Sequence, residues 1–169
     1  QTPEATFSFA GKWHGAQCAV INAEATELLR YKETLELSLV KSSPVSVYAV
    51  TSSTFKDDAS EMPLHFESGF IKLLPGDEEG TNKVEANFAH PFSLCEFAYG
   101  KYNHANKELI LEATQDTLLR GKCAKGKTTT GFKRHYTIDS NGDLTYKMYL
   151  GVNGDEPYHH LSATLKRVD

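Results

Sequence analysis

The sequence predicts an all-β protein, built as an up-and-down antiparallel β-barrel of about ten strands. Short segments of alternating apolar and polar residues recur along the chain, turn-forming residues separate them at hairpin spacing, and hardly any segment has a helical period. The length of 169 residues favours a single barrel domain over residues 1–169, with residues 1–8 as an N-terminal extension. A barrel of this strand number is wide enough to enclose a small ligand.

In the first half of the chain, the strands follow from period-2 alternation between turns. Gly11–Gly15 begins the first strand, in which Trp13 packs at one end of the barrel. Residues 16–25 have no strong period and are predicted to form a connector, with a short helical turn over residues 23–29. Further strands are expected over residues 31–39, 45–55 and 62–74. Apolar residues that share one face of the predicted strands form the expected core, which includes Leu35, Leu37, Leu39, Val84, Phe88, Leu109 and Leu111.

In the second half, the strand marked by Val84, Ala86 and Phe88 is broken by Pro91, because proline cannot donate a hydrogen bond to a β-ladder. The Asp139–Gly142 turn is a strong hairpin signal. The glycine-rich residues 122–129 are predicted to form a mobile basic loop. The remaining strands are expected over residues 93–102, 109–114, 132–138, 144–150 and 158–167.

Charge and hydropathy exclude two classes of partner. The chain has 18 Lys and Arg against 22 Asp and Glu, and these charges are interspersed, whereas a nucleic-acid-binding protein would need a basic patch. No apolar run approaches the length that spans a bilayer. Gln1 is not an initiator residue, so the chain is either a trimmed chain or a processed secretory product.

The cysteines do not form a metal motif. Cys18, Cys95 and Cys123 fit no zinc-ligand spacing, and either one disulfide between two of them or three buried thiols is compatible with the sequence. Cys18 and Cys95 each have one apolar neighbour, Ala19 and Leu94 respectively, and are expected to be core thiols.

Histidines are the candidate site residues. On the closing strand, alternation places His159 on the same face as Leu161, Ala163 and Leu165, so His159 rather than His160 is expected to point inward; solvated rim histidines are the alternative. His65, near the start of its strand, either lines a pocket or bonds to backbone in a turn, and His90 is expected to hold a kink before Pro91.

No nucleophile and base pair stands out in the sequence. Gly126-Lys127-Thr128 lacks the upstream glycine and the following helix of a phosphate-binding loop. The sequence therefore predicts no catalytic protein acid, base or nucleophile.

Several ordered segments carry a family resemblance. The chain resembles the nitrobindin family of all-β haem proteins, which is similar to the haem-binding domain of THAP-type proteins and to barrels of the lipocalin and fatty-acid-binding type. The resemblance covers nearly the whole chain, from about Phe9 to Val168. The matching segments are Gly11–Gly15 (GKWHG), Pro63–Phe70 (PLHFESGF), Phe88–Pro91 (FAHP), Arg134–Asp139 (RHYTID) with Leu144–Tyr146 (LTY), and Pro157–Leu165 (PYHHLSATL).

The resemblance implies a ten-stranded barrel with one haem b near its open end. The family's proximal iron ligand falls on His160, immediately before Leu161, and a β-bulge at the rim would reconcile this with the alternation argument. The family's second histidine beside the haem falls on His65, with Leu64 packing against the porphyrin.

One departure concerns the distal wall of the haem pocket. Residues 16–23 replace a glycine-rich run and a Pro-Thr-Ile of the family, are roughly two residues longer and lack proline. The glycine that follows His-Pro in the family is also missing, near Phe92 and Ser93. This departure is compatible with another haem chemistry, another tetrapyrrole or a lipid. It also makes Gln17 or Asn22 a candidate to cover the iron.

The family implies a function at an open iron coordination site, namely reaction with nitric oxide and isomerisation of peroxynitrite to nitrate. The competing hypothesis is a non-enzymatic carrier for haem, another tetrapyrrole or an apolar molecule such as a fatty acid. The resemblance implies a cytoplasmic location, while the residue at position 1 and the cysteines leave secretion open. A monomer and a homodimer are both compatible with the sequence.

Overall fold

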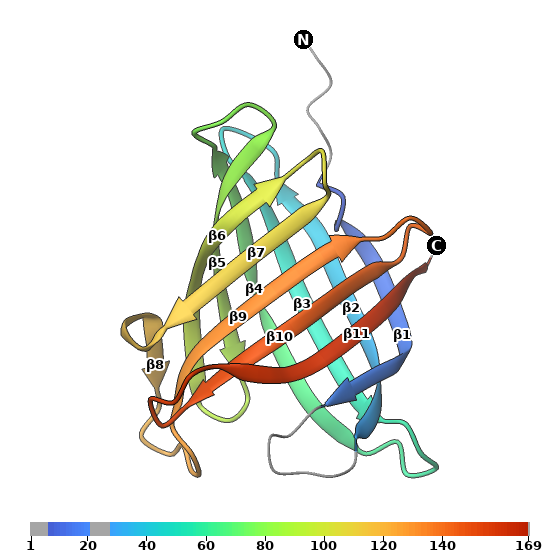
Figure 1. Cartoon of the computed structure of the whole chain (residues 1–169), viewed down its shortest axis with the longest axis vertical. Coiled ribbons are helices and arrows are strands. Elements are labelled where there is room, and N and C mark those ends of the chain that lie inside the picture. The colour runs from blue at the N-terminus through green and yellow to red at the C-terminus, as the bar shows by residue number, and fades with distance from the viewer. Residues whose placement is uncertain (1–6, 21–27, 169) are drawn as a thin grey trace.

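The computed structural model describes residues 7–20 and 28–168. Apart from one short 3-10 helix, η1 (Gln115–Thr117), the regular elements of these residues are β-strands (Figure 1). The strands are β1 (Gly11–Val20), β2 (Leu29–Lys41), β3 (Ser46–Lys56), β4 (Pro63–Pro75), β5 (Thr81–His90), β6 (Leu94–Asn103), β7 (Glu108–Thr114), β8 (Leu118–Arg120), β9 (Thr129–Ile138), β10 (Leu144–Val152) and β11 (Tyr158–Val168).

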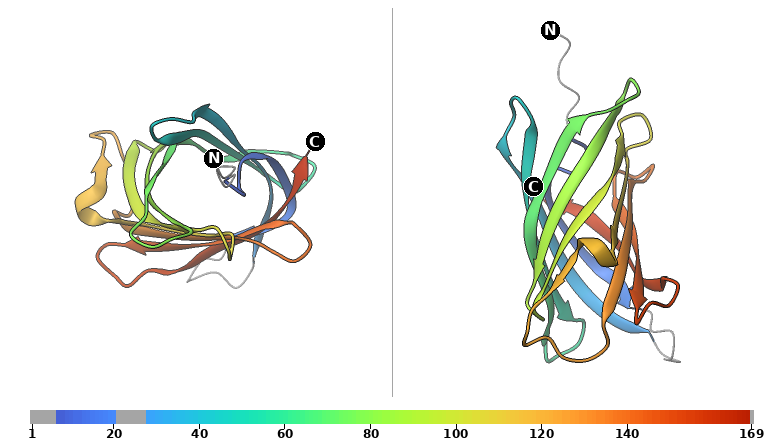
Figure 2. Two further views of the ribbon diagram at one scale, coloured as in Figure 1. Left: turned by 90° about the horizontal axis from the view of Figure 1, so that it is seen from above. Right: turned by 90° about the vertical axis from the view of Figure 1, so that its left-hand side faces the viewer.

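Ten of the described strands close into an antiparallel barrel. Each pairs with its neighbour along the chain, except that β7 pairs directly with β9, and β1 pairs with β11 to complete the ring. The short strand β8 lies outside the ring, where it pairs with β6. The view along the barrel shows the closed outline (Figure 2). The prediction of an all-β, ten-stranded up-and-down barrel is therefore confirmed.

One end of the barrel is filled by aromatic side chains. Phe7 is 1% exposed, and its ring centroid lies 4.9 Å from that of Tyr48 and 5.0 Å from that of Tyr102. The indole Nε1 of Trp13 donates a hydrogen bond to the carbonyl oxygen of Phe9 at 2.8 Å. We call this set (Phe7, Phe9, Trp13, Tyr48 and Tyr102) the aromatic end.

The aromatic end changes the role of two residues that the sequence places in an N-terminal extension. Phe7 packs inside the core, and the backbone N–H of Ser8 donates to the Tyr102 hydroxyl at 3.2 Å. Because an aromatic side chain fills the barrel interior here, Phe7 and Ser8 are part of the barrel packing.

The predicted connector is wrong for residues 16–20, and most of the predicted helical turn lies outside the described residues. Residues 16–20, predicted to be part of a connector, instead continue β1, because a register shift between Gly15 and Cys18 restores pairing with β2 after the irregular stretch. Of the predicted helical turn at residues 23–29, residues 23–27 lie outside the described part of the chain, while Leu29 is already the first residue of β2.

Two side chains predicted to lie in the core are exposed. Leu35 and Leu37 are buried, but Leu39 is 56% exposed, because it lies near the β2–β3 turn, where the register also shifts. Cys95 is exposed on β6, opposite Ala89, whereas Cys18 is buried; alternation places the side chain of Cys95 on the outer face. All three cysteines are free thiols.

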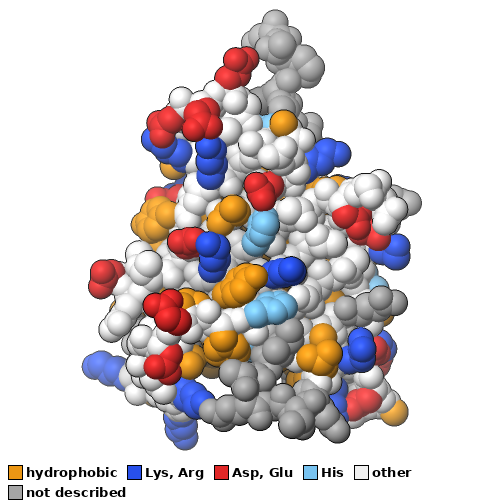
Figure 3. All heavy atoms as spheres, viewed as in Figure 1, with side chains coloured by type: hydrophobic (Ala, Val, Ile, Leu, Met, Phe, Trp, Pro, Cys, Tyr) orange, Lys and Arg blue, Asp and Glu red, His pale blue; other side chains and the backbone are white. Residues whose placement is uncertain are grey.

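The outer surface of β7, β9, β10 and β11 carries interspersed acidic and basic side chains (Figure 3). Cross-strand pairs join Lys133 to Glu112 at 2.8 Å and His135 to Glu108 at 2.7 Å on this face. Among the described residues, no helix is long and apolar enough to cross a bilayer.

Candidate functional site

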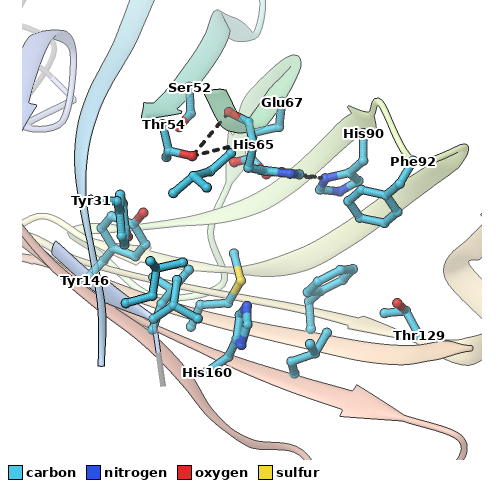
Figure 4. Close-up of a pocket in the computed structure, with 17 residues that line it drawn as sticks. Tyr31, Ser52, Thr54, His65, Glu67, His90, Phe92, Thr129, Tyr146 and His160 are labelled. Atoms are coloured by element: carbon cyan, nitrogen blue, oxygen red, sulfur yellow. Dashed lines mark hydrogen bonds and ion pairs between the residues drawn. The ribbon is translucent and has the colours of Figure 1, made fainter. Parts of the chain in front are cut away.

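The end of the barrel opposite the aromatic end contains a cavity of about 350 Å³. We call this cavity the pocket. Its lining comes from eight strands and from Phe92 in the turn between β5 and β6, and Figure 4 shows these residues around the pocket. Apolar side chains predominate, including Leu64, Met148, Leu150 and Leu161. The volume lies within the range of small-molecule sites, and the mixture of apolar walls with a few polar groups is typical of them.

A β-bulge in β11 directs His160 into the pocket. Along the β10–β11 pair, Met148 lies opposite Leu161 and Tyr149 lies opposite His159, so His160 is the extra residue between two regular pairs. Both His160 and Leu161 therefore line the pocket, although they are consecutive. The His160 ring also makes an edge-to-face contact with Tyr158, with centroids 5.9 Å apart.

His159 has a different environment. Its Nε2 lies 2.8 Å from the Ser162 hydroxyl and 3.0 Å from the Leu161 carbonyl oxygen, and its ring packs 5.4 Å from that of Tyr149. None of the pocket lining comes from His159. The alternation prediction for this histidine pair is wrong, because the bulge reverses the side-chain direction within one residue.

Across the pocket from His160 lies His65 of β4 (Figure 4), and the adjacent Leu64 also lines the pocket. The backbone N–H of His65 donates to the Thr54 hydroxyl at 3.0 Å, which fixes the entry of β4 into the barrel. The half-buried His65 ring lies beside His90, with its Nε2 3.2 Å from His90 Nδ1. The His65 ring therefore lines the pocket and contacts the side chains of His90 and Glu67, whereas its tether to Thr54 is made by its backbone.

Behind these histidines lies a buried network of charges. Arg134, which is 0% exposed, donates through Nη1 to Glu96 Oε1 and through Nη2 to Glu67 Oε2 at 3.3 Å. His90 Nε2 lies 3.1 Å from Glu96 Oε2. Burial alone would raise the pKa of Glu67, but the Arg134 charge and the two neighbouring imidazoles outweigh burial and lower this pKa to about 2. Glu67 is therefore ionised at neutral pH.

A second buried carboxyl group lies deeper in the barrel. Glu33 accepts hydrogen bonds from the Ser52 hydroxyl at 2.9 Å and from the Tyr146 hydroxyl at 2.6 Å. Burial raises the pKa of Glu33 to about 7, against the effect of these two donors. Burial also raises the pKa of the nearby Cys18 thiol to about 12, so this cysteine stays protonated and is not a nucleophile.

The donor set of the pocket fits a haem held by one imidazole. A haem needs apolar surfaces for its macrocycle and a nitrogen ligand for its iron. Met148 and Leu161, which pair with each other next to His160, provide apolar surface, and Leu64, Leu150 and Phe92 add to it. His160, His65 and Leu64, the residues that the family resemblance implies, all line the pocket.

Some pocket residues were missed by the sequence prediction. Glu67 follows His65 by two positions, and period 2 alone places it on the same face of β4. His90 was assigned to a kink, but its ring stacks on Phe92 and Phe132 and contacts the pocket. No local signal in the sequence indicates that Arg134 and Glu96, 38 residues apart, pair with each other. The Gln17 side chain and all of Asn22 lie outside the described part of the structure.

Comparison with known proteins gives concordant results. The family model described as "THAP4-like, heme-binding beta-barrel domain" matches residues 4–167. The chain is 35% identical to the "Peroxynitrite isomerase" of Frankia alni over 106 residues, which cover 63% of this chain and 67% of that protein. It is 27% identical over 172 residues to the "Peroxynitrite isomerase 1" of Rhodococcus jostii, covering 98% of this chain and 84% of that protein.

A solved structure has the same architecture. The crystal structure of Rv2717c from M. tuberculosis superposes with a TM-score of 0.74 at 25% sequence identity, and the match covers 96% of this chain and 94% of that one. The family match extends along nearly the whole chain. The closed ten-stranded barrel and the pocket with its inward-facing histidine agree with this family assignment. The chain belongs to the family of THAP4-like, heme-binding β-barrel domains, the nitrobindin type.

Proposed function

We propose that the pocket binds one haem b, and that His160 is the residue that would hold its iron. The observation that carries this proposal is the β-bulge, which turns His160 into an apolar cavity opposite His65. The backbone pairing on either side of the bulge sets the direction of the His160 side chain. The imidazole is therefore oriented toward the pocket before a ligand binds.

We further propose that the haem-bound protein isomerises peroxynitrite to nitrate. A bound ferric haem would supply the iron chemistry for this isomerisation. The chain's own contribution is to hold and orient this group: His160 fixes one side, and His65 and Phe92 border the other. The protein is expected to shape access to this group rather than to transfer protons.

Curated relatives support this activity. The proteins of Frankia alni and Rhodococcus jostii to which the chain is similar carry the name peroxynitrite isomerase. The alternative is a carrier of haem, another tetrapyrrole or an apolar small molecule. The predominance of apolar side chains in the pocket favours that alternative equally, so reactivity must be measured directly.

Hemin titration tests the binding step. Wild-type protein is expected to bind one equivalent of hemin with a shift of the Soret band, and His160→Ala is expected to lose this shift. His159→Ala is the matched control, since the neighbouring ring bonds to Ser162 outside the pocket lining, and it should retain the shift. Loss of the shift in His159→Ala but not in His160→Ala would reverse the assignment.

Stopped-flow mixing with peroxynitrite tests the reaction. Ferric haem-bound protein is expected to accelerate peroxynitrite decay with nitrate as the product, and His65→Ala should retain this acceleration because no proton transfer by His65 is needed. His160→Ala should lose it together with the haem. Stoichiometric haem binding without acceleration would favour the carrier.

A further inference from the structure

Three ligand-type atoms converge on the pocket wall opposite His160. They are His65 Nε2, His90 Nδ1 and Glu67 Oε2, which lie within 4.8 Å of one another. We call this set the His–Glu–His cluster. The two histidines and the carboxylate come from β4 and from the last residue of β5, and all three residues line the pocket (Figure 4).

The spacing of these atoms matches that of metal ligands. Nε2 of His65 lies 3.2 Å from Nδ1 of His90 and 3.8 Å from Oε2 of Glu67, and the latter two atoms are 3.6 Å apart. A point equidistant from three atoms with these separations lies about 2.1 Å from each, within the range of about 2.0–2.2 Å for Zn–N and Zn–O bonds. No backbone movement is therefore required to bring the three atoms to bonding distance of one ion.

The hydrogen bonds around His90 favour a ligand role. With a proton on Nε2, His90 donates to Glu96 Oε2 at 3.1 Å, and Nδ1 is left with a lone pair directed at the cluster. A carboxylate that accepts from the far nitrogen of a histidine is the usual outer partner of metal-bound imidazoles. Arg134 in turn holds Glu96.

The His90 ring is also fixed by packing. Its side chain is 2% exposed, and it stacks on Phe92 at 5.1 Å and on Phe132 at 5.6 Å. Glu67 is held from behind by Arg134, whose bond to Oε2 leaves that oxygen a second lone pair. The network contains two carboxylates, Glu67 and Glu96, and only one guanidinium, that of Arg134. Its excess negative charge can partly neutralise a bound divalent cation.

We infer that the His–Glu–His cluster binds a divalent transition-metal ion, with Zn²⁺ and Fe²⁺ as the ions that two imidazoles and one carboxylate suit best. The remaining coordination position faces the pocket, because His65, Glu67 and His90 all line it. Such an open position is typical of reactive rather than purely structural metal sites. This site goes beyond the proposed haem function, because none of its ligands is His160.

Cobalt titration tests the inference, since Co²⁺ takes zinc-type sites and its visible d–d absorption reports the ligands. The full-length chain is treated with a chelator, kept free of haem and titrated with Co²⁺. One equivalent is expected to give d–d bands that Zn²⁺ abolishes by displacement. His65→Ala and His90→Ala should lose these bands, and circular dichroism establishes that each variant is folded. His65 is half-buried, so its substitution is the milder of the two for the fold.

Two control variants separate this site from other metal ligands and from the haem function. His14→Ala removes an exposed histidine and should retain the d–d bands. His160→Ala should also retain them, even though it loses hemin binding. A wild-type protein that binds Co²⁺ but not hemin would thus reject the proposed haem function alone, and one that binds hemin but not Co²⁺ would reject the metal site alone.

Two further results would overturn the inference. Unchanged d–d bands in folded His65→Ala would place the ion elsewhere. A thiolate-to-cobalt charge-transfer band in place of the d–d signature would assign the ion to the exposed thiols of Cys95 or Cys123.

Discussion

Two buried glutamates in the same barrel have opposite electrostatic environments. Glu67 lies beside Arg134 and two imidazoles, and its pKa falls to about 2. Glu33 has only neutral hydroxyl donors, so burial dominates and its pKa rises to about 7. A neighbouring cation, rather than depth of burial, therefore determines which carboxyl group is charged at neutral pH.

Glu33→Gln is expected to change the pH dependence of stability. The pKa of Glu33 is higher in the folded than in the unfolded state, so between about pH 4.5 and 7 the folded protein binds more protons. Stability accordingly falls as pH rises through this window, by about 3 kcal/mol for this shift. Glutamine cannot ionise, so urea unfolding of the variant across this window should lack that decrease.

The matched control for this prediction is Glu36→Gln. Glu36 is exposed on the outer face of the same strand, so its substitution should leave the slope of stability against pH as in the wild type. An equal decrease in stability in wild type and Glu33→Gln would mean that Glu33 is already ionised in the folded protein.

At the scale of single elements, β11 combines two patterns. Its second half alternates regularly, with Ala163 and Leu165 buried and Thr164 and Lys166 exposed. Its first half contains the bulge at His160, opposite a shift between Met148 and Tyr149. The strand thus completes the barrel with one half and positions a pocket side chain with the other.

Deleting His159 is expected to abolish hemin binding even though His160 remains in the chain. Without the extra residue, His160 takes the position opposite Tyr149 and regular alternation turns its ring out of the pocket. The measurement is the Soret shift on hemin addition, with circular dichroism as the test of folding. Because His159→Ala keeps the bulge, it should still bind hemin; binding by the deletion variant would show that the bulge is not required.

In the whole molecule, one end of the barrel contributes tight core packing and the other end contains the binding pocket. The aromatic end packs tightly around Phe7 and Tyr102, whereas the pocket leaves about 350 Å³ unfilled at the other end. Because most of the core lies outside the pocket, the haem-free chain is expected to unfold cooperatively, and haem to add stability by mass action.

Phe7→Ala is expected to lower the free energy of unfolding by about 3–5 kcal/mol, the usual cost of removing a buried phenylalanine ring. Hemin affinity of the folded variant should equal that of the wild type, because Phe7 does not line the pocket. Urea unfolding of haem-free protein and hemin titration measure the two quantities. Leu119→Ala, at a side chain that is 73% exposed, is the control and should change neither. A parallel loss of hemin affinity in Phe7→Ala would mean that the two ends are coupled.

The barrel and much of its core can be predicted from the sequence. Alternation identified Leu35, Leu37, Leu109 and Leu111 as inward residues, and all four are buried. These predictions succeed because period 2 and turn chemistry are local properties of a strand and its hairpin. Leu39 has the same alternation but is exposed, because its distance from the barrel end depends on the register with β3.

The arrangement of the pocket depends on how distant strands pair, and it could not be predicted from the sequence. The bulge that turns His160 inward is a property of the β10–β11 pairing, so alternation within β11 could not predict it. The contacts of Arg134 with Glu96 and Glu67 span 38 and 67 residues of sequence. His90 joins His65 for the same reason, since β4 and β5 bring them together at one barrel end. Side-chain direction at a bulge and contacts between distant strands depend on register, which a single strand's sequence does not specify.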